Sequence, residues 1–302
     1  MFYDAYGSRL FVRITELPEY CLRRTKLKIL ADSAETIIAA ARNGKSQPVR
    51  VLELGAGTAS QTDVLLDAVV SLQGAVLYMP VDVSPDALDI ARERTTSLLS
   101  DVCGEPIVPN YVTHPPQLKS FEGTTLTLYL GSSIGNFSPD QARTILQNLS
   151  SQLQSGDALL LGTDMAKDES ILLAAYDDRD GITAEFNTNI LSRLNRELDA
   201  DFDPTTFRGR AVWNRLESRI EMHLESVCSQ RVHIAAARVS LHFAAGETIH
   251  TENSCKFTSE SIRDLLGAAG FDVEQNWTDG REWYAVTLAR LPLCSFQDGN
   301  RD

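Results

Sequence analysis

The chain has 302 residues, which is long enough for two domains or for one large domain with an insertion. Hydrophobic residues make up 43% and charged residues 23%, as in ordinary globular proteins. The formal net charge is −13, and the sequence has no basic stripe. This balance argues against a nucleic-acid partner, because binding to phosphates needs clustered Lys and Arg.

No apolar run approaches the roughly 18 residues that a membrane-spanning helix needs, and the first residues do not follow the signal-peptide pattern. The five cysteines include no CxxC pair, and the five histidines form no HxxxH motif. An odd cysteine count without paired spacing is typical of a reducing compartment. We therefore expect a cytoplasmic protein with no membrane partner, no disulfide framework and no bound metal.

Residues 49–166 alternate apolar runs with amphipathic stretches. Two of the predicted helices begin with Ser84-Pro85 and Ser138-Pro139, an N-cap serine followed by proline at the first helical position. Near-continuous apolar strands between helices are typical of a parallel sheet that is covered on both faces. The predicted strands span residues 49–57, 75–83, 106–112, 125–133 and 157–165.

The alternation stops after residue 166. Residues 167–200 read as helix and residues 210–257 as strands, and the alternation then resumes with a helix at 259–270 and two strands at 271–279 and 283–291. This order predicts an α+β segment inserted into an α/β domain. The predicted division is 24–166 plus 256–302 for the α/β domain and 1–23 plus 167–255 for the second domain.

The segment VLELGAGTAS, residues 51–60, places glycines directly after the first predicted strand. Gly55 and Gly57 would let the backbone approach a ligand closely. The second strand ends in Asp82, whose carboxylate can accept both hydroxyls of a ribose. Together they predict a cofactor that contains a nucleoside. Ser60 stands where a dinucleotide fingerprint has its third glycine, which disfavours a nicotinamide oxidoreductase.

Two later segments carry further candidate residues. LGSSIGNFSPDQA, residues 130–142, follows the fourth strand, and its Asn136 is either a ligand-binding amide or an asparagine in a turn before a helix. HTENSCKF, residues 250–257, has strand spacing. That spacing predicts one face with His250, Glu252, Ser254 and Lys256 and another with Thr251, Asn253 and Cys255.

Several stretches together resemble the histidine-specific N-alpha-methyltransferases, a family of class I S-adenosylmethionine-dependent methyltransferases. The resemblance extends from about Tyr3 to about Arg290. The stretches are YDAYGSRLFVRITELPEY, LGSSIGN, LLLGTDMAKD, AYDDRDGITAEFNTNIL, NRELDADFD, RIEMHLES, FAAGETIHTENSCKF and the late WTD.

The resemblance implies a Rossmann-like seven-stranded sheet with an inserted α+β substrate-binding domain. It also implies trimethylation of free L-histidine to hercynine, the first step toward ergothioneine. S-adenosyl-L-methionine would be the methyl donor and S-adenosyl-L-homocysteine the product. We expect a monomer whose partner is a small molecule. Alternatives are an N-methyltransferase for another free amino acid, such as tryptophan, and a non-catalytic cofactor-binding homologue.

The family's site residues can be transferred by position. The imidazole would be held by Tyr20, Glu252 and Ser254, and the carboxylate by Asn136 and Tyr176. The pocket near the amine and ring would be lined by Tyr3, Phe11, Gly131 and Met222, with Tyr3, Gly131 and Asn136 at the reacting amine. The cofactor would be held by Gly55, Gly57, Gln61, Asp82, Thr113 and His114. Gln61 and the Thr113-His114 pair depart from the family's usual residues at these places.

The reaction itself sets a charge pattern. The amine must lose a proton before each attack, and a carboxylate beside it would oppose that loss. We therefore expect neutral groups at the amine and the charged Glu252 at the imidazole, where it would favour a protonated ring. The aromatic faces of Tyr3 and Phe11 would tolerate a trimethylammonium group.

Overall fold

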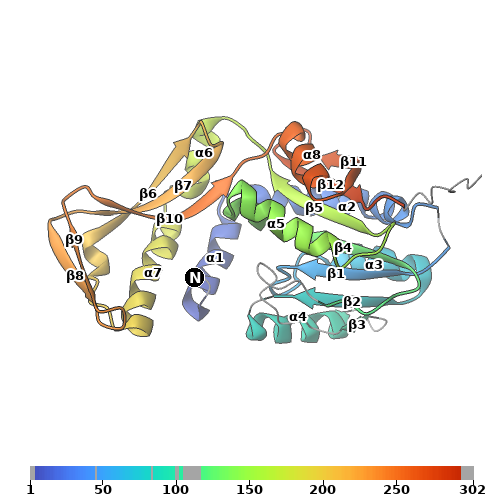
Figure 1. Cartoon of the computed structure of the whole chain (residues 1–302), viewed down its shortest axis with the longest axis horizontal. Coiled ribbons are helices and arrows are strands. Elements are labelled where there is room, and N and C mark those ends of the chain that lie inside the picture. The colour runs from blue at the N-terminus through green and yellow to red at the C-terminus, as the bar shows by residue number, and fades with distance from the viewer. Residues whose placement is uncertain (1–3, 45, 83, 99–101, 105–116, 294–302) are drawn as a thin grey trace, which may run out of the picture. The chain divides into compact units, whose positions relative to one another are not determined.

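The computed structural model describes residues 4–44, 46–82, 84–98, 102–104 and 117–293. The chain forms two compact units (Figure 1). Unit 1 consists of Met1–Arg24 and Ala166–Lys256, and unit 2 of Thr25–Met165 and Phe257–Asp302.

Unit 2 is built on a seven-stranded sheet in the order β11-β12-β5-β4-β1-β2-β3, which confirms the predicted seven-stranded α/β fold. The five strands from β3 to β5 are parallel, and β12 and β11 add an antiparallel edge. The strands are β1 (Val49–Leu54), β2 (Val76–Val81), β3 (Val102–Gly104), β4 (Thr124–Tyr129), β5 (Ala158–Asp164), β11 (Asp272–Thr278) and β12 (Tyr284–Arg290). The third strand expected at 106–112 lies outside the described residues.

Two helices of unit 2 begin with the serine caps that the sequence predicts. Ser138 accepts a hydrogen bond from the backbone of Gln141, and the Gln141 side chain accepts one from the backbone of Ser138, so the two form a capping box. Ser84 accepts a hydrogen bond from the Ala87 backbone N–H at 3.3 Å. The helices are α2 (Leu22–Arg42), whose first turn belongs to unit 1, α3 (Asp63–Gln73), α4 (Pro85–Leu98), α5 (Pro139–Ser150) and α8 (Ser259–Ala268).

A buried arginine ties α2 to the sheet. Arg290 in β12 donates to Glu274 in β11 at 2.6 and 2.8 Å. The same guanidinium donates to the carbonyls of Ala40 at 2.9 Å and Ala41 at 3.1 Å, in the last turn of α2. The Ala40 carbonyl also accepts from the backbone N–H of Asn43 at 3.0 Å, so Arg290 adds a second donor there and supplies one to Ala41, while Glu274 balances its charge.

Unit 1 packs helices against antiparallel strands. Leu10 and Ile14 of the first helix share a core with Phe186 and Ile190 of the long helix. The helices are α1 (Ala5–Glu16), α6 (Glu169–Tyr176) and α7 (Ile182–Leu198), with the short η2 (Pro204–Thr206). A three-stranded sheet has the order β10-β7-β6, and β8 pairs with β9. The strands are β6 (Phe207–Asn214), β7 (Arg219–Ser226), β8 (Gln230–Ile234), β9 (Val239–Phe243) and β10 (Thr248–Cys255).

The prediction of one helical region over residues 167–200 was too simple, because the chain forms two helices there. Gly181 adopts a left-handed conformation, with φ of +70°, at the start of α7. The buried carboxylate of Asp178 accepts hydrogen bonds from the backbone N–H groups of Ile182 at 2.9 Å and Thr183 at 2.7 Å. These bonds lower the pKa of Asp178, although its burial alone would raise it.

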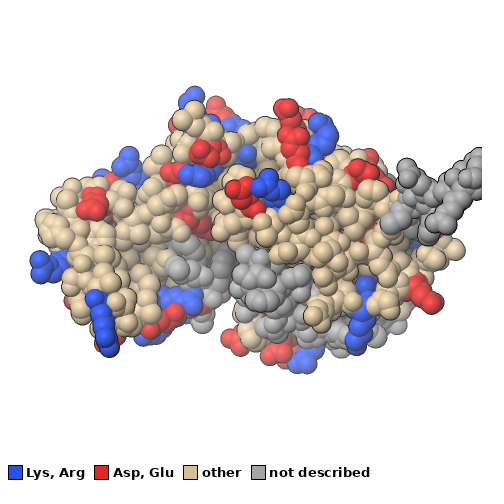
Figure 2. All heavy atoms as spheres, viewed as in Figure 1, with Lys and Arg blue, Asp and Glu red and all other residues tan. Residues whose placement is uncertain are grey.

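None of the helices in the described residues is long and apolar enough to cross a membrane. Lys and Arg side chains are interspersed with Asp and Glu on the described part of the face seen in Figure 2.

We predict that Asp178→Ala lowers the free energy of unfolding by about 1–2 kcal/mol, the usual cost of losing a helix cap. The reason is that two backbone donors at the start of α7 lose their acceptor. Chemical denaturation would measure the change. The neighbouring Asp177→Ala, at an exposed position, serves as the control and should change the free energy by less than about 0.5 kcal/mol. Equal losses in both variants would contradict the capping role.

Candidate active site

The glycine loop of unit 2 follows β1. Gly55 and Gly57 have φ of +66° and +54°, a conformation that side chains with a Cβ rarely adopt. The Asp82 carboxylate, after β2, accepts hydrogen bonds from the backbone N–H groups of Gly57 and Ser84, both at 2.9 Å. Asp82 therefore holds the loop beside the start of α4.

A buried carboxylate stabilises the end of β1, from which the glycine loop begins. Glu53 in β1 accepts a hydrogen bond from the Thr62 hydroxyl at 2.6 Å and another from the Tyr78 hydroxyl. Burial raises the pKa of Glu53, and the two hydrogen bonds and the nearby Lys26 oppose that rise. These contacts join β1, β2 and the residue that precedes α3, so the loop has a fixed base.

The loop fits a cofactor that contains a nucleoside. A Cβ added to Gly57 would have no atom within 4 Å, so there is open space beside the loop backbone. The Asp82 oxygens keep lone pairs that can accept ribose hydroxyls. Gln61 Oε1 is buried and has no hydrogen-bond partner among the described residues, which suits a donor on a ligand. Thr113 and His114 lie outside the described residues.

A second turn follows β4 in the same unit. Gly131 is exposed, and the short helix η1 (Ser133–Asn136) ends in the partly buried Asn136. Because β4 and β1 are adjacent and parallel, this turn lies at the same sheet edge as the glycine loop. Unit 2 therefore brings together Gly55, Gly57, Asp82, Gly131 and Asn136 at the carboxyl ends of β1, β2 and β4.

In unit 1, strand β10 places Glu252 and Ser254 on one face. Glu252 pairs with Met222 of β7 and Ser254 pairs with Ile220, so both share the face of these two apolar residues. His250 pairs with His223, on the other face. The prediction that His250 points the same way as Glu252 was therefore wrong.

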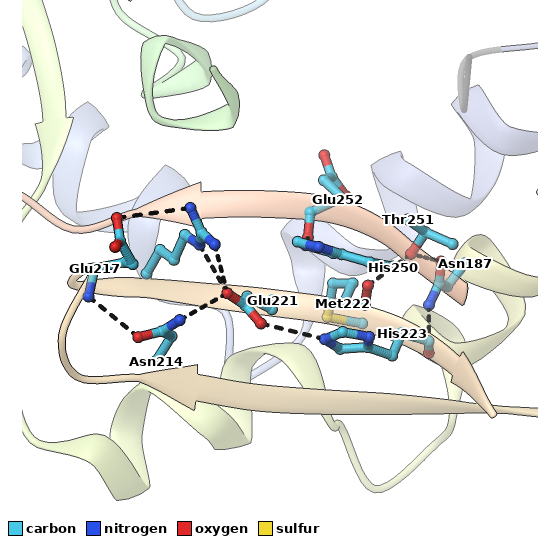
Figure 3. A network of polar contacts seen from close by, with 10 residues as sticks. Asn187, Asn214, Glu217, Glu221, Met222, His223, His250, Thr251 and Glu252 are labelled. Atoms are coloured by element: carbon cyan, nitrogen blue, oxygen red, sulfur yellow. Dashed lines mark hydrogen bonds and ion pairs between the residues drawn. The ribbon is translucent and has the colours of Figure 1, made fainter. Parts of the chain in front are cut away.

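The reason is a β-bulge between His250 and Glu252. The extra residue is Thr251. Its hydroxyl donates to Asn187 Oδ1 at 2.6 Å and to the Met222 carbonyl at 2.9 Å. Asn187 in α7 is 2% exposed and donates to the His223 carbonyl at 3.1 Å. The buried amide thus binds both strands at the bulge (Figure 3). A bulge reverses the alternation of side chains beyond it.

Three polar groups meet at the end of β10. The Tyr176 hydroxyl, from the last residue of α6, donates to Ser254 Oγ at 2.7 Å. Lys256 Nζ donates to Ser254 Oγ at 2.8 Å and to the Tyr176 hydroxyl at 2.9 Å, and it lies 4.7 Å from the centre of the Tyr176 ring. Lys256 was not among the predicted site residues, although strand spacing placed it on the face of Ser254.

Glu252 lies in an environment that disfavours its charge. Burial raises its pKa to about 7, and the charge of Lys256 opposes the rise. A carboxylate with this pKa can gain or lose a proton near neutral pH, as is common for groups in functional sites. Near neutral pH, Glu252 can therefore release its proton at a modest cost in free energy and accept a hydrogen bond from a ligand N–H.

The other face of β10 and β7 carries a separate network (Figure 3). The rings of His223 and His250 stack with their centres 4.7 Å apart, and His223 Nε2 lies 3.4 Å from Glu221. Asn214 and Arg219 donate to Glu221 at 2.9 and 2.8 Å and lower its pKa to about 2. Each of Glu221, His223 and His250 offers one possible metal-ligand atom, and these three atoms lie within 4.8 Å of one another. Arg219, however, already neutralises the carboxylate.

The remaining predicted substrate residues lie in unit 1. Phe11 packs with its ring centre 6.1 Å from that of Phe186, and Tyr20 packs against the same hydrophobic core. Met222 is 3% exposed and packs with Leu172 and Ile220. Tyr3 lies outside the described residues. Unit 1 thus carries the residues predicted for the imidazole, whereas Gly131 and Asn136 belong to unit 2.

Comparison with solved structures identifies the class of fold. The chain is similar to a crystal structure of an S-adenosylmethionine-dependent methyltransferase from Clostridium acetobutylicum ATCC 824, with a TM-score of 0.52 at 13% identity. The match covers 96% of this chain and all of the other. The fold is therefore that of the class I methyltransferases, as predicted.

Sequence comparison identifies the family. The family model described as histidine-specific, SAM-dependent methyltransferase matches residues 1–291, so the chain belongs to this family and uses S-adenosylmethionine. The histidine N-alpha-methyltransferase of Mycolicibacterium smegmatis is 41% identical over 95% of this chain and 88% of its own length. That of Mycobacterium tuberculosis is 39% identical over the same shares. The ergothioneine biosynthesis protein 1 of Neurospora crassa is 28% identical over 96% of this chain and 32% of its own length. The resemblance found in the sequence is confirmed.

We predict that Gly57→Ala weakens S-adenosylmethionine binding by at least tenfold, because the new methyl group enters the open space beside the loop. The matched control is Gly74→Ala at the end of α3, which also has positive φ and open surroundings. Both variants should lose about 1 kcal/mol of stability through backbone strain. Calorimetric titration would separate them, and an unchanged affinity in Gly57→Ala would contradict the loop's role.

We predict that Glu252→Gln stabilises the fold at pH 8 by roughly 2 kcal/mol. The pKa of Glu252 is raised from 4.5 to about 7, so its contribution to stability is present below pH 4.5 and is lost as the pH rises through 7. The gain from glutamine should therefore shrink on acidification and vanish near pH 4. Denaturation curves across this range would measure it, and a gain independent of pH would contradict the assignment.

Proposed function

We propose that the protein transfers three methyl groups from S-adenosylmethionine to the α-amine of free L-histidine, forming hercynine. The observation that carries the proposal is that Glu252 and Ser254 lie on the same face of β10, in a chain of the histidine-specific family. The names of the relatives support N-alpha specificity and a place in ergothioneine biosynthesis.

The proposed cofactor residues are those of the glycine loop. Gly55 and Gly57 permit close backbone approach, and Asp82 accepts the ribose hydroxyls. S-adenosylmethionine supplies a methyl group on a sulfonium, which an amine can displace directly. The chain needs no covalent nucleophile for this step, and its main contribution is to hold the two reactants in line, which can be worth roughly 7–11 kcal/mol.

Charge placement separates the two ends of the substrate. The proposed groups at the amine are the Gly131 carbonyl and the Asn136 amide, which are neutral and do not oppose loss of the amine proton. The carboxyl group of Glu252 belongs to the imidazole end. Such a division lets the amine deprotonate before each transfer while the ring remains bound.

Continued methylation removes N–H donors from the amine and ends with a permanent cation. Neutral acceptors lose little when a donor becomes a methyl group, and an aromatic face such as that of Phe11 attracts a trimethylammonium group. We therefore assign tolerance of the intermediates to neutral and aromatic groups.

A screen of the twenty amino acids by calorimetry, with S-adenosylhomocysteine present, tests the substrate. Histidine should bind at least a hundredfold more tightly than tryptophan. An indole has one N–H and no acceptor, so it cannot satisfy both Glu252 and Ser254. Tighter binding of tryptophan than of histidine would contradict the proposal.

We predict that Glu252→Ala weakens histidine binding by at least tenfold, because the imidazole N–H loses its acceptor. The affinity for S-adenosylmethionine should change by less than twofold. Glu247→Ala, at an exposed position just before β10, is the control and should leave both affinities unchanged. Unchanged histidine affinity in Glu252→Ala would refute the role of this carboxylate.

A further inference from the structure

Lys256 follows the last residue of β10 and is 4% exposed. A buried ammonium is costly unless it has hydrogen-bond partners. Two of its partners are the hydroxyls of Ser254 and Tyr176, at 2.8 and 2.9 Å. Its backbone is also fixed, since its N–H donates to the Ser218 carbonyl at 2.7 Å and its carbonyl accepts from the Ser218 hydroxyl at 3.0 Å. The ammonium is therefore held at one place.

The number of protons limits what these groups can offer a ligand. An ammonium only donates, whereas each hydroxyl has one proton and two acceptor lone pairs. Lys256 occupies one lone pair on Ser254, and the Tyr176 hydroxyl occupies the other at 2.7 Å. A phenol is a better donor than an alcohol, which favours this direction of the bond. Ser254 then has no acceptor site left, and its own proton points away from Lys256 and Tyr176.

We propose that Lys256 is a positioning residue that fixes Ser254 as a hydrogen-bond donor, so that the site binds the imidazole of histidine as a neutral ring. This inference rests on the proposed function. The unprotonated ring nitrogen accepts from Ser254, and the ring N–H donates to Glu252. A protonated ring has no acceptor nitrogen, so it would face the Ser254 proton with an N–H.

The proposal replaces two expectations: that Glu252 favours a protonated ring, and that Tyr176 binds the substrate carboxylate, since the single proton of the Tyr176 hydroxyl goes to Ser254. One donor and one acceptor match a ring that has one nitrogen of each kind, and among the aromatic side chains only neutral imidazole has both a donor and an acceptor nitrogen. Lys256 therefore acts on specificity through Ser254, without touching the substrate.

Nitrogen NMR of the wild-type protein tests the ring state directly. Ring-¹⁵N histidine is bound in the presence of S-adenosylhomocysteine at pH 6, where free histidine is mostly protonated, and at pH 8, where the Glu252 carboxyl, with its pKa of about 7, is mostly ionised. We expect two separate signals, one from a protonated and one from an unprotonated nitrogen. Two protonated nitrogens would overturn the proposal. If histidine does not bind at all, the proposed function fails instead.

A double-mutant cycle tests the role of Lys256. Lys256→Met removes the charge and keeps an unbranched side chain, and Ser254→Ala removes the hydroxyl. Each should raise the Kd of histidine roughly fivefold to tenfold. The Kd of the double variant should be no more than about tenfold above that of the wild type, because both changes break the same contact. Independent effects, which would multiply to roughly fiftyfold or more, or an unchanged Kd in Lys256→Met, would overturn the proposal.

Two controls separate positioning from loss of structure. Lys28→Met changes an exposed lysine of α2 that pairs with Asp32 at 2.8 Å, and it should leave the Kd of histidine within twofold. The Kd of S-adenosylhomocysteine should stay within twofold in every variant, because the proposed cofactor residues belong to unit 2. If Lys256→Met does not fold, the NMR experiment on the wild-type protein still decides the ring state.

Discussion

The bulge at Thr251 determines which side chains of β10 share a face. Without it, strict alternation would place His250 beside Glu252 and Ser254. The extra residue moves His250 to the face of His223, and its hydroxyl meets the buried amide of Asn187. Glu252 and Ser254 remain together on the other face, and the end of the strand brings Ser254 to Tyr176. The proposed binding of an imidazole by Glu252 and Ser254 depends on this bulge.

In unit 2, the regular topology of the parallel sheet brings the proposed cofactor residues together. Parallel strands end at one sheet edge, so the turns after β1, β2 and β4 lie close together without any special contact. Asp82 links two of these turns through the Gly57 and Ser84 backbones. The buried Glu53 below them joins the same strands. The cofactor site thus follows from topology, whereas the substrate face of unit 1 follows from particular side-chain bonds.

This difference explains what the sequence alone could predict. Apolar runs, paired glycines and Ser-Pro helix starts are local signals, and they predicted six of the seven strands, the glycine loop and the caps of α4 and α5. The seven-stranded sheet as a whole was implied by the family resemblance. The bulge depends on Asn187, which is 64 residues from Thr251 and becomes its neighbour only through folding. The break between α6 and α7 depends on Gly181, whose conformation a helical pattern hides. The sequence did not single out Lys256 as a site residue, because its burial depends on the packing of α6 against the sheet.

Product analysis by mass spectrometry tests the central claim, that this chain completes the methylation of free histidine. The purified protein is incubated with S-adenosylmethionine and histidine as the sole acceptor, and the products are followed over time. The account predicts that a product with three added methyl groups accumulates and that tryptophan in place of histidine gives none. A reaction that stops after one methyl group, or no transfer to histidine, would contradict it.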